Sequence, residues 1–132
     1  MANEVIETRS GKFWLGEDGI VRIVIVPTPE RSQADAEESI AAFVKLCRGQ
    51  MRPALADIRN TKTTNREERL AYTKAEEAKL VLALGLLVES PLSRIIASFF
   101  LGISKLPFPT KVFTSEEAAL LWLRGFVELK NG

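Results

Sequence analysis

The chain has 132 residues, of which 46% are hydrophobic and 27% are charged, and this composition is typical of a single globular domain with a buried core. A formal net charge of +1 gives no general attraction to nucleic acid or to an anionic membrane. The chain has no histidine and one cysteine, which excludes histidine-based catalytic triads, a structural zinc site and an internal disulfide.

The same features favour a cytoplasmic protein that does not insert into a membrane. The most apolar stretch, residues 80–88, is too short to span a bilayer. The N-terminal segment lacks the basic and then apolar order of a signal peptide, and a single cysteine suits a reducing compartment. No motif for a cofactor or a metal ion stands out, and we expect neither.

The first two predicted strands form a hairpin, with residues 13–15 before the turn and residues 20–26 after it. Asp18 and Gly19 lie between them, and this pair favours a tight turn because glycine adopts a positive φ without strain. A proline-rich segment that begins at Pro27 ends the second strand, since proline cannot donate a hydrogen bond to a neighbouring strand.

The first helix is predicted to begin near Ser32, with either Ser32 and Asp35 or Asp35 and Glu38 as its capping pair. One apolar stripe at helical spacing consists of Ile40, Phe43, Val44 and Cys47. Gly49 is a plausible C-cap. Cys47 reads as a small core residue and not as a nucleophile, because reactive thiols need an exposed, electropositive setting.

The rest of the chain alternates extended and helical segments. Strands are predicted at residues 53–60, 81–89 and 110–115, and helices at residues 65–80, 90–104 and 116–126. Asn65, Ser90 before Pro91, and Thr114 with Glu117 are the expected helix caps. The order is β-β-α-β-α-β-α-β-α, which predicts an α/β fold: a mostly parallel sheet, opened by an antiparallel hairpin, with helices packed on it. The first ten and last three residues are expected to be loose.

This order resembles the STAS domain, the fold of bacterial anti-sigma-factor antagonists, and the STAS-like, lipid-carrier-like group of uncharacterised bacterial proteins. The local likeness lies in PALADIRN and in SPLSRIIASFFLGISKLPFPTKVFTSEEAALLWL. It covers roughly residues 12–127, and we expect residues 1–132 to form one STAS-like domain. The resemblance implies a non-enzymatic bacterial domain that acts in regulation by binding another protein.

The resemblance does not imply that this chain has the phosphorylation switch of the antagonists, because the phosphorylated serine is missing at its expected position. Their strand equivalent to PALADIRN also ends in an aspartate, as Asp57 does here, and a loop then leads to an Asp-Ser-Gly-like helix start with the phosphorylated serine. Counting forward without gaps places Asn65 at that aspartate and Arg66 or Glu67 at the serine. A short gap would bring in Thr63 or Thr64, but no glycine follows.

Polar side chains at the ends of the predicted parallel strands should meet at one edge of the sheet. The candidate site residues are Asp57, Arg59, Asn60, Thr63, Thr64, Ser90, Ser93, Arg94 and Thr114, and Thr28, Glu89 and Ser115 also follow strands. Two arginines beside helix N-termini would suit a phosphate or a carboxylate. Alternatively, these groups only cap helices and bond loop amides, or the loop 61–64 and the charged helix after it dock a partner protein.

The predicted helix 90–104 and the segment after it carry more apolar area than one helix face needs. The candidate association surface consists of Phe99, Phe100, Ile103, Leu106 and Phe108. These residues either belong to the core or form a contact surface, for example of a homodimer. Protein binding is therefore the favoured function. The alternative is a carrier or sensor of a small apolar, lipid-like or anionic ligand, held between the last two helices and the sheet.

Overall fold

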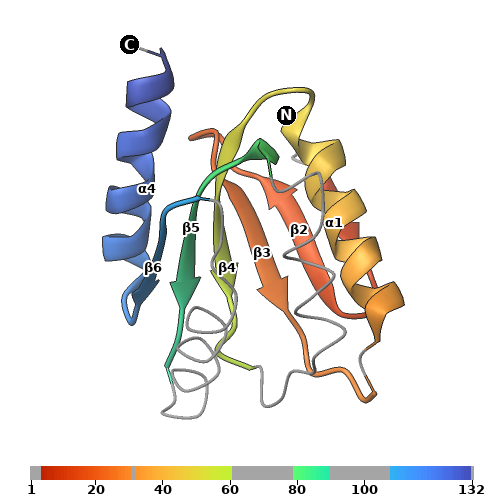
Figure 1. Cartoon of the computed structure of the whole chain (residues 1–132). Coiled ribbons are helices and arrows are strands. Elements are labelled where there is room, and N and C mark those ends of the chain that lie inside the picture. Colours follow the sequence, from red (N-terminus) through yellow and green to blue (C-terminus); the bar gives the residue numbers. More distant parts are fainter. Residues whose placement is uncertain (1–3, 31, 61–78, 90–107, 132) are drawn as a thin grey trace.

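The computed structural model describes residues 4–30, 32–60, 79–89 and 108–131. Six strands form one sheet in the order β1-β2-β3-β4-β5-β6 (Figure 1). The strands are β1 (Val5–Glu7), β2 (Gly11–Leu15), β3 (Val21–Ile25), β4 (Arg52–Asp57), β5 (Val81–Leu87) and β6 (Thr110–Phe113). The two pairings among β1, β2 and β3 are antiparallel, and the three among β3, β4, β5 and β6 are parallel. The predicted α/β fold with an antiparallel opening is confirmed.

The predicted hairpin between β2 and β3 is present. Gly19 has a φ of 82°, which is the conformation that its position in the turn requires. The Asp18 carboxylate accepts a hydrogen bond from the Ile20 amide at 3.1 Å and pairs with Arg22 at 2.8 Å. The turn is thus held by its own side chains as well as by the backbone.

The expectation that the first ten residues are loose is wrong for residues 5–7. They form β1, which lies antiparallel to β2 with Val5 opposite Trp14 and Glu7 opposite Lys12. Ile6 packs partly against the core cluster that contains Phe13. The β-branched pair Val5-Ile6 is the sequence signal for this strand, but three residues are too few for a periodicity to appear.

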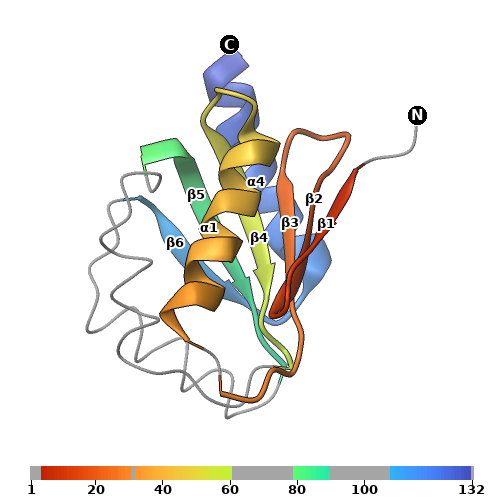
Figure 2. The ribbon, with the colours of Figure 1, turned by 90° about the vertical axis from the view of Figure 1, so that its right-hand side faces the viewer.

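Two helices cover the two faces of the sheet (Figures 1 and 2). Helix α1 (Gln33–Cys47) packs on the face that carries Phe13 and Val21. Helix α4 (Glu116–Asn131) packs on the opposite face, over Leu55 and Ala83. The predicted helices 65–80 and 90–104 lie in segments that, apart from residues 79–80, fall outside the described residues. No helix in the described part is long and apolar enough to cross a membrane.

Helix α1 begins as predicted after Ser32, whose amide donates to the Asp35 carboxylate at 2.9 Å. The predicted apolar stripe is wrong in part, because Ile40 and Val44 are only half-buried. The buried face consists of Asp35, Ala36, Ser39, Ala42, Phe43, Leu46 and Cys47. An apolar periodicity misses this face because two of its members are polar. The left-handed C-cap residue is Arg48 and not Gly49, although Gly49 also has a positive φ.

The buried Asp35 is held by a network that joins three parts of the chain. Its carboxylate pairs with the Arg9 guanidinium at 2.6 Å, and the Asp35 side chain is 4% exposed while that of Arg9 is 48% exposed. Arg9 also donates to the Pro29 carbonyl oxygen, and the hydroxyl of Ser39 donates to the Asp35 carbonyl oxygen at 3.1 Å. Arg9 therefore ties the turn between β1 and β2 to the start of α1.

Helix α4 is capped one residue later than predicted. The Ala118 amide donates to the Ser115 hydroxyl at 3.2 Å, so Ser115 takes the capping role expected of Thr114. The buried core of this side contains Leu87, Ala119 and Leu123. Phe113 and Trp122 lie against each other beside it, with ring centroids 5.7 Å apart. This packing fixes the first turn of α4 beside the ends of the strands.

Candidate functional site

The carboxyl ends of β3, β4, β5 and β6 lie at one edge of the sheet, the lower edge in Figure 1, here named the carboxyl edge. Backbone bonds continue beyond the strands and hold the following segments together. The Ile58 amide donates to the Leu87 carbonyl oxygen at 3.0 Å, and the Val88 amide donates to the Phe113 carbonyl oxygen at 2.8 Å. Backbone hydrogen bonds thus hold the carboxyl ends of β4, β5 and β6 side by side.

Asp57 and Arg59 form a two-point ion pair at this edge. The Arg59 Nε and Nη2 atoms donate to the two Asp57 carboxylate oxygens at 2.9 and 2.6 Å, and the Arg59 amide donates to Asp57 Oδ1 at 3.1 Å. Burial alone would raise the pKa of Asp57, but the hydrogen bonds from Arg59 and its positive charge outweigh burial and lower it. Asp57 is therefore ionised at neutral pH and fixed in one orientation.

Two further carboxylates act on Arg59. The hydrogen bond to Asp57 raises the pKa of Arg59, and the negative charges of Asp57, Glu89 and Glu116 add to this effect. Glu89 follows β5, and Glu116 lies in the first turn of α4. The sequence prediction placed Glu89 at this edge but missed Glu116, because α4 had to be oriented against the sheet first. One guanidinium and three carboxylates therefore share this part of the surface.

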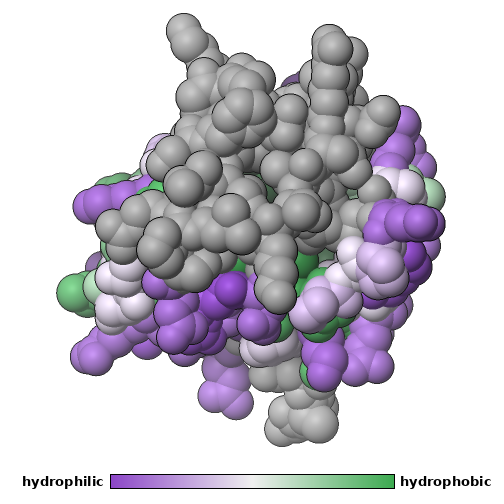
Figure 3. Space-filling model, turned by 90° about the horizontal axis from the view of Figure 1, so that it is seen from below, coloured by the Kyte–Doolittle hydropathy of each residue, from purple (hydrophilic) through white to green (hydrophobic). Residues whose placement is uncertain are grey.

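The structure describes some of the other residues predicted at this edge and leaves others outside the described ranges. Asn60 and Thr114 are exposed, after β4 and β6 respectively. The Thr28 hydroxyl is engaged, because it donates to the Val26 carbonyl oxygen at 2.8 Å. Thr63, Thr64, Ser90, Ser93 and Arg94 lie outside the described residues. Viewed from this edge, hydrophilic side chains gather on the surface beside the grey region, with small hydrophobic areas between them (Figure 3).

Among the residues that the structure describes, the charges of the carboxyl edge favour a cationic rather than an anionic contact. The positive charge among these residues is that of Arg59. Two nitrogens of its guanidinium already donate hydrogen bonds to the Asp57 carboxylate. A phosphate or a carboxylate would have to compete with Asp57 and approach Glu89 and Glu116. In the described ranges, no cluster of three acidic, cysteine or histidine residues is arranged to hold a metal ion.

Of the residues in the predicted association surface, the structure describes Phe108. Phe108 is half-buried just before β6, and its carbonyl oxygen accepts a hydrogen bond from the Thr110 hydroxyl at 3.2 Å. Phe99, Phe100, Ile103 and Leu106 lie outside the described residues, as does the space predicted for a small ligand beside them. Cys47 is completely buried, which agrees with its predicted place in the core.

The ion pair predicts how stability changes in acid. Because the pKa of Asp57 is lower in the folded chain than its unfolded value of about 3.9, its contribution is complete above that value and is lost as the pH falls through the folded pKa. Urea unfolding of the wild type and of Asp57→Asn should therefore differ most near neutral pH and converge in acid. Arg59→Gln should reduce the pH dependence in the same way. An unchanged difference from pH 7 to pH 3 would contradict the pairing.

The fold of this chain is similar to that of a protein whose crystal structure is known. A crystal structure of an uncharacterised protein of the DUF3478 family from Shewanella loihica PV-4, described as having a SpoIIAA-like fold, is similar with a TM-score of 0.59 and 16% identity, over 92% of each chain. At this identity the likeness concerns the fold alone, and the chain has the SpoIIAA-like, STAS-like fold that the sequence predicts.

A protein of unknown function from Arthrobacter sp. FB24 is 33% identical over 84% of this chain and 96% of that one, with a TM-score of 0.30 that supports no structural argument. A search of curated proteins gave no match. The model of one protein family, described as a domain of unknown function (DUF7793), matches residues 13–127.

Proposed function

We propose that this chain, which belongs to the family of the domain of unknown function DUF7793, is a non-enzymatic regulatory domain that binds another protein at its carboxyl edge. The observation that carries the proposal is the grouping of Arg59 with Asp57, Glu89 and Glu116 where the parallel strands end. Ligands of parallel sheets bind at this edge. The resemblance to STAS antagonists, which act by binding a protein, supports the same role.

The chemistry of the edge favours binding over catalysis. A general base works best when its pKa lies near the working pH, and the pKa of Asp57 is instead lowered by its pairing with Arg59. The one thiol of the chain, that of Cys47, lies in the core and away from solvent. A fixed pattern of exposed charge, by contrast, is what steers a protein partner and sets its orientation.

The expected partner presents basic side chains to this edge. Glu89 is exposed, Glu116 is exposed, and the Arg59 charge is already matched by Asp57. Arginine or lysine side chains of a partner would approach Glu89 and Glu116 without displacing an internal ion pair. We further propose that the protein is cytoplasmic and that residues 1–132 form a single domain. The proposal also includes self-association through the segment 99–108.

Carboxylate removal tests the proposal. Candidate partners are obtained by affinity purification with the tagged chain, and the affinity of each purified partner is then measured for Glu89→Gln and Glu116→Gln. We expect each change to weaken binding by roughly two- to fivefold, as for exposed ion pairs, and more strongly at low salt. Glu128→Gln is the matched control, because Glu128 is exposed at the other end of α4.

The control separates the edge from the total charge of the chain. Glu116→Gln and Glu128→Gln remove the same charge from the same helix, so a partner that responds only to net charge weakens equally with both. A purified partner that binds all three variants with the affinity of the wild type would overturn docking at the carboxyl edge.

A further inference from the structure

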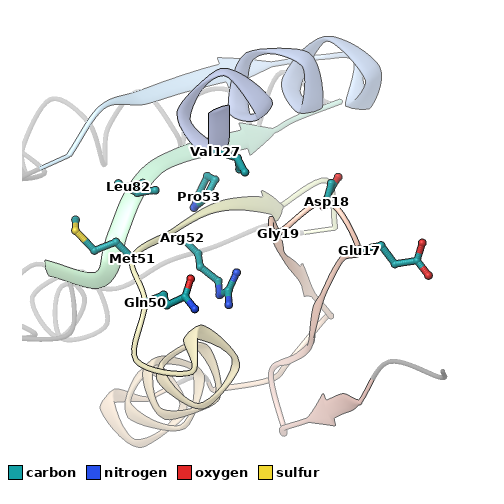
Figure 4. A pocket seen from close by; sticks show the side chains of 9 residues that line it. All are labelled: Glu17, Asp18, Gly19, Gln50, Met51, Arg52, Pro53, Leu82 and Val127. Carbon is teal, nitrogen blue, oxygen red and sulfur yellow. The ribbon is translucent and has the colours of Figure 1, made fainter. Parts of the chain in front are cut away.

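A second polar feature lies at the opposite edge of the sheet, where β4 and β5 begin. A cavity of about 200 Å³ opens there between the β2–β3 turn, the start of β4 and helix α4 (Figure 4). Its lining consists of Glu17, Asp18, Gly19, Gln50, Met51, Arg52, Pro53, Leu82 and Val127. This volume is below the roughly 300–1,000 Å³ of ordinary ligand pockets, so only a small molecule would fit.

Arg52 supplies a positioned cation in this cavity. Its Nε donates to the Cys47 carbonyl oxygen at 3.0 Å, which fixes the plane of the guanidinium against the end of α1. Its terminal nitrogens, Nη1 and Nη2, make no hydrogen bond to the residues that the structure describes. Gly19 lies beside this guanidinium, since a Cβ atom there would be in ordinary van der Waals contact at 3.8 Å from Arg52 Nη1 and 3.8 Å from Val127 Cγ1.

The other residues that line the cavity limit which charge and which shape a ligand can have. Leu82, Pro53 and Val127 supply an apolar side. The Asp18 carboxylate is bound by Arg22 on both oxygens, and Glu17 points away from Arg52 (Figure 4). A negatively charged group beside Arg52 would therefore meet neither an unpaired Asp18 carboxylate nor the Glu17 carboxylate.

We propose that this cavity binds a small monocarboxylate with an apolar body, with the carboxylate on the terminal nitrogens of Arg52 and the body against Leu82 and Val127. A guanidinium presents two parallel N–H donors, and these match the two oxygens of a carboxylate. The proposal does not depend on the protein-binding role of the carboxyl edge, which lies at the other end of the strands.

Benzoate is the probe, and benzamide, which has the same shape without the charge, is its control. In NMR titrations of the full chain, benzoate should shift the amide signals of Gly19 and Leu82 with a dissociation constant in the millimolar range. Benzamide should bind at least tenfold more weakly, since a hydrogen-bonded charge pair contributes about one to two powers of ten in affinity. Inorganic phosphate should also bind more weakly than benzoate, because it has no apolar body to contact Leu82 and Val127.

Two kinds of variant test the site separately. Arg52→Gln should reduce the affinity for benzoate at least tenfold, while Arg48→Gln, which removes the charge of an exposed neighbour, should leave it unchanged. Leu82→Trp fills the cavity and keeps Arg52, so it should abolish binding even if Arg52→Gln proves unstable. Absence of shifts at 19 and 82 in tens of millimolar benzoate, or benzoate binding that persists in Leu82→Trp, would overturn the proposal.

Discussion

Replacing Arg9 by leucine is expected to lower the free energy of unfolding by about 3 kcal/mol, which is the typical cost of leaving a buried charge without its partner. The Asp35 side chain is 4% exposed, and the Arg9 guanidinium binds it at 2.6 Å. Without Arg9, the carboxylate keeps the hydrogen bonds from Ser32 at the start of α1. The turn between β1 and β2 also loses its connection to the Pro29 carbonyl oxygen.

Urea unfolding of single and double variants measures this coupling. Asp35→Asn should be less harmful than Arg9→Leu, because it removes the buried charge and leaves a half-exposed guanidinium that water can solvate. The double variant should therefore be more stable than Arg9→Leu alone. Lys45→Leu is the control: its ion pair with Glu4 is exposed on both sides, and its loss should cost less than about 1 kcal/mol. Equal losses for Arg9→Leu and Lys45→Leu would contradict the structural role of Arg9.

Replacing Gly85 by valine is expected to destabilise the fold by about 1–3 kcal/mol, because it adds atoms to a core that has no space for them. A Cβ atom at Gly85 would lie 3.3 Å from Leu123 Cδ1 and 3.5 Å from Leu55 Cδ1. The γ-methyl groups of valine reach further toward α4 than this Cβ. Helix α4 would have to move off β5, and the contacts of Leu123 would be lost with it.

A glycine in α4 itself provides the control for this prediction. A Cβ atom at Gly125 would meet nothing within 4 Å, so Gly125→Ala should stabilise the chain by about 0.5–1 kcal/mol through helix propensity. Thermal unfolding should show the two substitutions moving the midpoint in opposite directions. In a Leu123→Ala background, Gly85→Val should cost less than in the wild type, because the side chain it would crowd has been shortened. Equal costs in both backgrounds would show that α4 does not press on Gly85.

The main elements of the fold followed from local signals. The Asp18-Gly19 turn, Ser32 at the start of α1 and the apolar segment that became β5 are each recognisable within about ten residues. Strand β1 was missed because three residues carry no periodicity, and part of the buried face of α1 was missed because Asp35 and Ser39 are polar. Both errors concern contacts between distant segments, namely Ile6 with the Phe13 cluster and Arg9 with Asp35.

The position of the candidate site in the fold could be predicted from the sequence better than the kind of group that it would bind. The sequence placed Asp57, Arg59, Glu89 and Thr114 at one edge, because parallel strands bring their carboxyl ends together. It suggested an anion site from Arg59 and Arg94 beside helix N-termini. The structure pairs Arg59 with Asp57 and places the charge of Glu116 near it, while Arg94 lies outside the described residues. An ion pair between residues two apart depends on the backbone path after the strand, which residue types alone do not specify.

The sequence by itself determined the strands of the parallel sheet, the first and the last helix, the tight turn and the position of Cys47 in the core, because these depend on backbone preferences and on apolar periodicity over short distances. Only the tertiary structure decided which polar groups meet: Arg9 with Asp35, Arg59 with Asp57 and Glu116, and Arg52 with the cavity beside Gly19. The reason is physical. Burial of apolar side chains depends mainly on area and tolerates many neighbours, while a hydrogen bond or an ion pair forms only within a few tenths of an ångström of one geometry, and the whole packed chain sets that geometry.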